Sequence, residues 1–166
     1  PYFEKRSIIH FTTEQVEQIL NEEFPSIITY DKIYDLIESR HTIKNLNDVA
    51  PVVDAIQTLD SKIDLLNDEQ DKYLARKIIK ALAILKLHGK TINNGATPEE
   101  LANELLITPT KFNAGDEIRL VIEKLRKVTD GQFINRTEND YYYIDLNLTV
   151  DYDQKIARKA ETLSES

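Results

Sequence analysis

The chain has 166 residues, 41% of them hydrophobic, and carries 21 Lys and Arg against 29 Asp and Glu, for a net charge of −8. A core can therefore be buried, and few glycines with 30% charged residues are typical of a helix-rich soluble protein. The acidic balance disfavours nonspecific binding to nucleic acid or anionic membranes. We find no apolar run of membrane-spanning length and no signal peptide, and we expect a cytoplasmic protein.

Neither cysteine nor methionine occurs in the sequence. Without cysteine there is no disulfide and no thiolate metal site. A chain that lacks even an initiating methionine is expected to be a piece of a longer protein. The segment from Asp151 to Leu163, which resembles a helix cut off in mid-course, supports this expectation.

Residues 1–66 hold six basic and twelve acidic side chains and predict an acidic helical unit. Thr12 and Gln15 fit the capping box of a first helix that ends at Pro25. A second helix is expected after Thr29, which can cap it. Its expected apolar face consists of Ile33, Leu36 and Ile37.

A third helix is expected after Asp48, a second candidate cap. Its apolar residues recur in a heptad-like seam, which predicts lengthwise packing on a neighbouring helix. The seam consists of Val52, Ile56, Leu59, Ile63 and Leu66. The charge then changes sign, because residues 67–96 hold six basic and three acidic side chains. We place a domain boundary between residues 66 and 67.

Residues 67–146 show the order of a winged helix-turn-helix, three helices followed by a hairpin. The first helix is expected from Glu69 to Leu87 and is stopped by Gly89. One face of it carries Leu74, Ile78, Ala81, Leu82 and Leu85.

The second helix of this module has the clearest local signal in the chain. Thr97, Pro98 and Glu100 supply a cap, a proline at the first helical position and the glutamate of a capping box. The expected apolar face consists of Leu101, Leu105 and Leu106.

The third helix is expected after Asn113, with a turn at Asp130–Gly131 and strands at Phe133–Ile134 and Tyr141–Ile144. Its buried stripe consists of Ile118, Val121, Ile122, Leu125 and Val128. We thus expect a mainly α protein with a small β-hairpin (α+β). The expected units are a helical unit (1–66), a winged helix (67–146) and a C-terminal helix or linker (147–166). A three-helix bundle with an appended hairpin is the nearest alternative.

A DNA reader places the third helix in the major groove, so its exposed side should be basic. Between Thr97 and Leu146, however, we count six basic and ten acidic residues. An exposed leucine among mixed charges suits a protein partner, and a solvated helix face is the alternative. The candidate protein-contact residues are Asp116, Arg119, Leu120, Glu123 and Lys127.

A row of cations on the first helix of the module is where nucleic acid would bind. Its alternative role is pairing with the acidic unit that precedes it. The candidate nucleic-acid contacts are Lys72, Arg76, Lys80, Lys86 and Lys90, extended by Arg119 and Arg126.

No phosphate-binding loop, dinucleotide fingerprint or nucleophile motif is present, and His10, His41 and His88 lack metal-ligand spacing. We therefore expect no catalytic, cofactor-binding or metal-binding residue in this segment.

Five stretches resemble large bacterial P-loop ATPases of BREX-type phage defence, the BrxC/PglY group. They are Ser26–Asp31, Ala75–Leu82, Gly95–Asn103, Leu125–Gly131 and Tyr141–Leu146. The resemblance implies a lid-like helical unit followed by a winged helix, C-terminal to a nucleotide-binding core. ATP and Mg²⁺ are implied for that core alone, and no catalytic residue is carried over.

We therefore expect a non-catalytic regulatory or assembly region of a cytoplasmic ATPase, in contact with the rest of that ATPase or with other defence proteins. A DNA-binding module of a DNA-acting ATPase is the alternative. A stand-alone transcriptional regulator is a weaker one, because the basic recognition helix is lacking.

Overall fold

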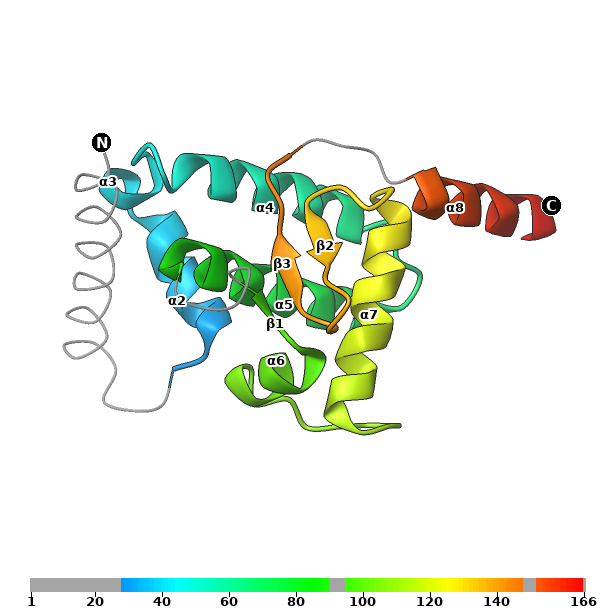
Figure 1. Ribbon diagram of the computed structural model, residues 1–166. Helices are drawn as coiled ribbons and strands as arrows, with labels where there is room; N and C mark the ends of the chain where they lie inside the picture. Colours follow the sequence, from blue (N-terminus) through cyan, green and yellow to red (C-terminus); the bar gives the residue numbers. More distant parts are fainter. Residues whose placement is uncertain (1–27, 90–94, 148–151, 166) are drawn as a thin grey trace.

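The computed structural model describes residues 28–89, 95–147 and 152–165 (Figure 1). The helix expected between Thr12 and Pro25 lies outside these ranges, as do His10 and Lys90. The helices are α2 (Tyr30–Ser39), α3 (His41–Lys44), α4 (Ala50–Ile63), α5 (Glu69–His88), α6 (Pro98–Glu104), α7 (Ala114–Val128) and α8 (Tyr152–Glu165). The strands are β1 (Gly95–Ala96), β2 (Ile134–Arg136) and β3 (Tyr142–Ile144).

The described part of the chain is mainly helical with a small antiparallel sheet, so the predicted α+β class is confirmed. The sheet has three strands in the order β1-β3-β2, with Gly95 opposite Tyr143 and Ile134 opposite Ile144. The sequence predicted the hairpin of β2 and β3 but not β1. A strand of two residues is too short to show an alternating pattern, and only its partner β3 defines it.

The expected helices α2 and α4 are present, but neither begins with the predicted side-chain cap hydrogen bond. Thr29 occupies the N-cap position of α2 without a side-chain hydrogen bond. The cap predicted at Asp48 is wrong, because Val49 holds the N-cap position of α4. There the carbonyl of Leu46 accepts from the backbone N–H groups of Val49 and Ala50, so the helix start needs no side-chain acceptor.

The heptad-like seam is buried in its entirety, from Val52 to Leu66, and α4 packs on α5 as the pattern predicts. One hydrophobic cluster continues from Tyr34 through this seam to α5, α7 and Ile144 of β3. The core is therefore continuous across Asn67, the sequence position where the charge changes sign.

The ends of α5, α6 and α7 follow their local signals. Gly89 ends α5 in the left-handed conformation (φ 68°), and Asn113 accepts the N–H of Asp116 at the start of α7. The capping box of Thr97 and Glu100 is complete. The apolar faces predicted for α5 and α7 are buried, except that Val128 is only partly so.

The expectation that Leu106 joins the buried face of α6 is wrong, since its side chain is 61% exposed. The N–H groups of Leu106 and Ile107 bond back to the carbonyls of Asn103 and Ala102. This closing turn puts Leu106 in the left-handed region (φ 51°) and turns its side chain away from the core.

The C-terminal helix predicted from Asp151 to Leu163 is present as α8. This helix contacts α7 and extends away from the rest of the described chain (Figure 1). Over the described ranges, no helix combines the length and the apolar character needed to cross a membrane.

Candidate protein-contact face on α7 and the hairpin

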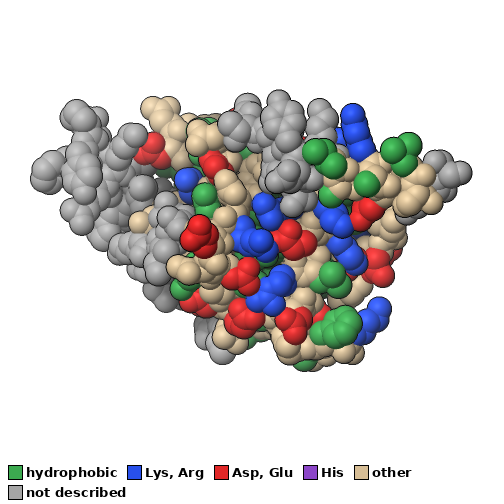
Figure 2. Space-filling model, turned by 45° about the vertical axis from the view of Figure 1, so that its right-hand side comes forward, with side chains coloured by type: hydrophobic (Ala, Val, Ile, Leu, Met, Phe, Trp, Pro, Cys, Tyr) green, Lys and Arg blue, Asp and Glu red, His purple; other side chains and the backbone are tan. Residues whose placement is uncertain are grey.

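The solvent-facing side of α7 forms, with the hairpin of β2 and β3, a mixed-charge surface with exposed apolar residues. We call the predicted set Asp116, Arg119, Leu120, Glu123 and Lys127 the α7 face. All five residues lie on α7, and Leu120 is 47% exposed. Figure 2, which brings this side of the molecule forward, shows basic and acidic side chains interspersed rather than gathered into a basic patch.

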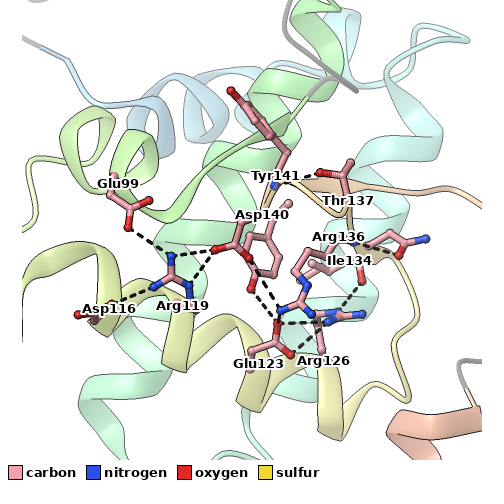
Figure 3. A network of polar contacts seen from close by, with 12 residues as sticks. Glu99, Asp116, Arg119, Glu123, Arg126, Ile134, Arg136, Thr137, Asp140 and Tyr141 are labelled. Atoms are coloured by element: carbon pink, nitrogen blue, oxygen red, sulfur yellow. Dashed lines mark hydrogen bonds and ion pairs between the residues drawn. The ribbon is translucent and has the colours of Figure 1, made fainter.

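Arg119 is surrounded by three carboxylates from three different segments (Figure 3). Its Nε donates to Asp140 Oδ2 at 3.0 Å, and its Nη1 donates to Asp116 Oδ1 at 2.8 Å. Its Nη2 lies 2.8 Å from Asp140 Oδ2 and 3.3 Å from Glu99 Oε1. The hydrogen bond that Arg119 donates to Asp140, more than any other contact, raises the pKa of Arg119. A phosphate that approached this guanidinium would compete with carboxylates that already hold it.

Glu123 joins the hairpin to α7 one turn further along (Figure 3). Its Oε1 accepts from the hydroxyl of Tyr142 at 2.7 Å and from Nη1 of Arg136 at 3.3 Å. Burial, followed by the bond to Glu123, raises the pKa of Tyr142 to about 12, so the hydroxyl remains a donor at neutral pH.

Arg126 lies beneath this surface rather than on it. Its side chain donates to Glu123 at 3.1 Å and to the carbonyl of Ile134 at 3.3 Å. The residue is 7% exposed, so its guanidinium cannot reach a duplex lying on the surface. The sequence analysis named Arg126 as a candidate nucleic-acid contact, but its side chain is buried against the hairpin.

Two lysines of α7 extend its ion pairs to other helices. Lys127 lies 2.6 Å from Glu161 of α8, and Lys124 lies 2.6 Å from Asp71 of α5. Three basic side chains of α7 and one of the hairpin thus share one property, an internal carboxylate partner. They are Arg119, Lys124 and Lys127 of α7 and Arg136 of β2.

The loop before α7 adds an exposed apolar residue that the sequence analysis missed. Glu117 Oε1 accepts from the backbone N–H groups of Thr110 at 2.7 Å and Phe112 at 3.0 Å, and also from that of Lys111. These bonds hold the pKa of Glu117 at about 2, well below its ordinary value of 4.5. They fix a loop on which Phe112 is 60% exposed. The signal that could have revealed it is its position, because Phe112 directly precedes the predicted cap Asn113 and lies outside the buried stripe of α7.

The cations of α5 also pair within the chain. Arg76 donates to Asp60 at 3.0 Å and to Asp64 at 2.8 Å, and Lys80 donates to Asp35 at 2.6 Å. These carboxylates belong to α2 and to α4 with the turn that follows it, so the intramolecular interpretation holds for both cations.

The other members of the α5 row are less informative. Lys72 pairs with Glu69 one turn away, at 2.7 Å, and Lys86 is half-buried. Lys90 lies outside the described residues. On the described part of α5, Lys72, Arg76, Lys80 and Lys86 therefore do not form one exposed basic surface.

Over the ranges that the structure describes, no group of three or more His, Cys, Asp or Glu side chains is placed to hold a metal ion. The arrangement is that of a mainly helical α+β protein with a surface cross-linked by ion pairs. The family model for the DUF6079 second domain matches residues 1–150, and the chain belongs to this family. No curated protein and no solved structure matches it.

Proposed function

We propose that this chain is a non-catalytic regulatory or assembly region of a larger P-loop ATPase. In this proposal, residues 67–146 form a winged helix that contacts protein rather than DNA. The observation that carries the proposal is the internal neutralisation of the cations on the α7 face and hairpin.

The winged-helix part is supported by the order of the elements. The helix α5 is followed by β1, α6, α7 and the hairpin, and β1 pairs with β3 beside β2. A short strand between the first two helices that closes the sheet of a C-terminal hairpin is the arrangement expected of a wing attached to a helix-turn-helix. In this proposal α7 occupies the position of a recognition helix.

The preference for protein over DNA rests on electrostatics. Affinity for a duplex comes largely from lysine and arginine side chains that replace counterions on phosphates. Arg119 is already shared by three carboxylates, and Arg76 and Lys80 are engaged in the helix packing. Nothing in these contacts favours the alternative of a DNA-binding module.

The larger-protein part rests on two supports. The family is described as a second domain, which fits a region of a multidomain protein. The sequence resemblance to BREX-type phage-defence ATPases is the basis for proposing that the larger protein is an ATPase and that it acts in phage defence. In this proposal ATP and Mg²⁺ bind an upstream core, and the partners are the rest of that protein or other defence proteins.

A titration of the chain with a fluorescent duplex at several salt concentrations tests the preference for protein. We expect no saturable binding even at about 50 mM salt, where phosphate contacts are strongest. Affinity that falls steeply with rising salt would overturn the proposal in favour of the DNA-binding alternative. The isolated chain should also show no turnover of Mg²⁺-ATP.

A matched variant tests the reason as well as the outcome. Glu99→Gln combined with Asp140→Asn removes two of the three carboxylate charges at Arg119. If internal neutralisation is what prevents DNA binding, this double variant should bind the duplex more tightly than the parent chain. Equal affinity of the parent and the variant would contradict the electrostatic argument.

A further inference from the structure

Two exposed apolar residues flank the first turns of α7. Phe112 is 60% exposed in the loop just before the N-cap of α7, and Leu120 of the α7 face is 47% exposed two turns into the helix. Asp116 lies between them in the sequence and is itself exposed. Because residues four apart share one side of a helix, Asp116 and Leu120 lie on the same side of α7.

The charge at this end of the face is unbalanced. Glu99, Asp116 and Asp140 pair with Arg119, and Asp140 also lies 3.8 Å from Nη1 of Arg136. Together with Glu123, these carboxylates outnumber by one the three guanidiniums that they contact, those of Arg119, Arg126 and Arg136. The side chains of Glu99 and Asp116 are 59% and 51% exposed, so a partner can reach their carboxylates. Complementarity therefore demands a partner that carries positive charge.

The face is also held in place before any partner arrives. Glu117 fixes the backbone of the loop that bears Phe112, and Arg119 joins α6, α7 and the hairpin. A surface ordered in this way loses little conformational entropy on binding, which favours recognition even by a small contact area.

We propose that this face binds a basic amphipathic helix from another protein or domain. Apolar side chains of that helix pack on Phe112 and Leu120, and a lysine or arginine on its flank reaches the carboxylates around Arg119. The inference rests on the proposed function, since it names the class of partner for the same surface. A helix lying along a groove with apolar anchors at i, i+4 and i+7 is a common mode of peptide recognition.

The experiment uses the whole chain and two labelled synthetic peptides of about 15 residues. The first is an amphipathic helix with leucines at i, i+4 and i+7 and lysines and arginines on the flanks. The second has glutamate at every basic position. Fluorescence anisotropy should show binding of the basic peptide alone, with a dissociation constant on the order of 10 μM, as for a small transient interface.

Two variants probe the apolar and the acidic parts of the face separately. Leu120→Ser should weaken binding of the basic peptide at least about fivefold, because an anchor is lost. Glu99→Gln should weaken it about twofold to fivefold at low salt and have little effect at high salt. Two matched control variants lie on other helices. Leu163→Ser replaces a leucine of α8 that is 76% exposed, and Glu69→Gln removes a carboxylate of α5. Both should leave the affinity for the basic peptide unchanged.

Three results would overturn the inference. They are the absence of binding by the basic peptide up to about 1 mM, equal binding of the acidic peptide, and a loss of affinity in Leu163→Ser instead of Leu120→Ser. Each leaves the proposed function standing, because that proposal fails on the duplex titration. A duplex that binds and competes with the basic peptide would overturn both.

Discussion

The ion pairs that α5 makes with neighbouring helices and those that α7 makes lie in different surroundings. On α5, Lys77 and Lys80 face Asp31 and Asp35 of α2, and Asp31 is only 4% exposed. These pairs lie in the contact between packed helices. On α7, Arg119 pairs with carboxylates that remain largely open to solvent.

The difference shows that charge pairing alone does not decide whether a surface is available. The α5 pairs fasten one helix to its neighbours, and the apolar residues beside them, such as Ile78 and Ile79, are fully buried. The α7 pairs fix polar side chains on the same surface as Leu120, an apolar residue that is 47% exposed. Exposed apolar residues within an ordered polar rim, here Leu120 and Phe112, are the more informative sign of an interface.

The largest effect on stability is expected at Gly95, because β1 and β3 contact α5 and Tyr142 of β3 is bonded to Glu123 of α7. A Cβ at Gly95 would lie 2.1 Å from the backbone oxygen of Tyr142, the residue whose hydroxyl donates to Glu123. Gly95→Ala should therefore force β1 and β3 apart and lower the free energy of unfolding by about 3 kcal/mol in a urea titration. As a control, Gly89→Ala meets no atom within 4 Å and should cost only about 1 kcal/mol, for the left-handed φ. Equal losses would contradict the predicted clash.

Replacing one lysine of α5 and one of α7 tests the comparison directly. The side chains of Lys77 and its partner Asp31 are 20% and 6% exposed. Those of Lys127 and its partner Glu161 are 39% and 59% exposed. Lys77→Met leaves the buried carboxylate of Asp31, whose Oδ1 already lacks a hydrogen-bond partner, without its cation. We expect a loss of about 2 kcal/mol for Lys77→Met and less than about 0.5 kcal/mol for Lys127→Met. Chemical denaturation of the two variants measures both, and the reverse order would refute the distinction between a structural and an open set of pairs.

A third test concerns the loop that presents Phe112. The folded-state pKa of Glu117 is lowered from 4.5 to about 2, because three backbone N–H groups donate to its carboxylate. This stabilisation is fully present above the unfolded-state pKa and is lost as the pH falls through about 2. Glu117→Gln should therefore be less stable than the parent chain at neutral pH, and the difference should shrink between about pH 5 and pH 2. Urea midpoints at a series of pH values would show it, and a constant gap over that range would contradict it.

Much of the fold could be predicted because its signals are local. The capping box at Thr97 and Glu100, the cap at Asn113 and the stop at Gly89 each satisfy backbone groups within one turn, so sequence spacing suffices. The strand β1 and the start of α4 at Val49 are different, because backbone partners supply their hydrogen bonds.

The candidate site could be predicted only in part, for the same reason. The helical period placed Arg119 and Leu120 on the exposed side of α7. It could not show that Asp140, in a hairpin turn with φ 65°, would meet Arg119 from 21 residues away. Nor could it show that the hairpin would cover Arg126. Long-range partners follow from how elements pack, and the sequence pattern records only which faces are apolar.

The last and smallest gain or loss of stability is expected at Leu106, where one substitution separates backbone strain from peptide binding. This exposed residue adopts φ 51° at the end of α6, a conformation that favours glycine. Leu106→Gly should relieve the crowding of Cβ and raise the free energy of unfolding by about 1 kcal/mol. Because Leu106 follows α6 and is not among the residues proposed to contact the peptide, the variant should bind the basic peptide as the parent chain does. A stabilised variant that has lost the peptide would extend the contact surface onto the end of α6, and its exposed, strained leucine would then have a functional reason.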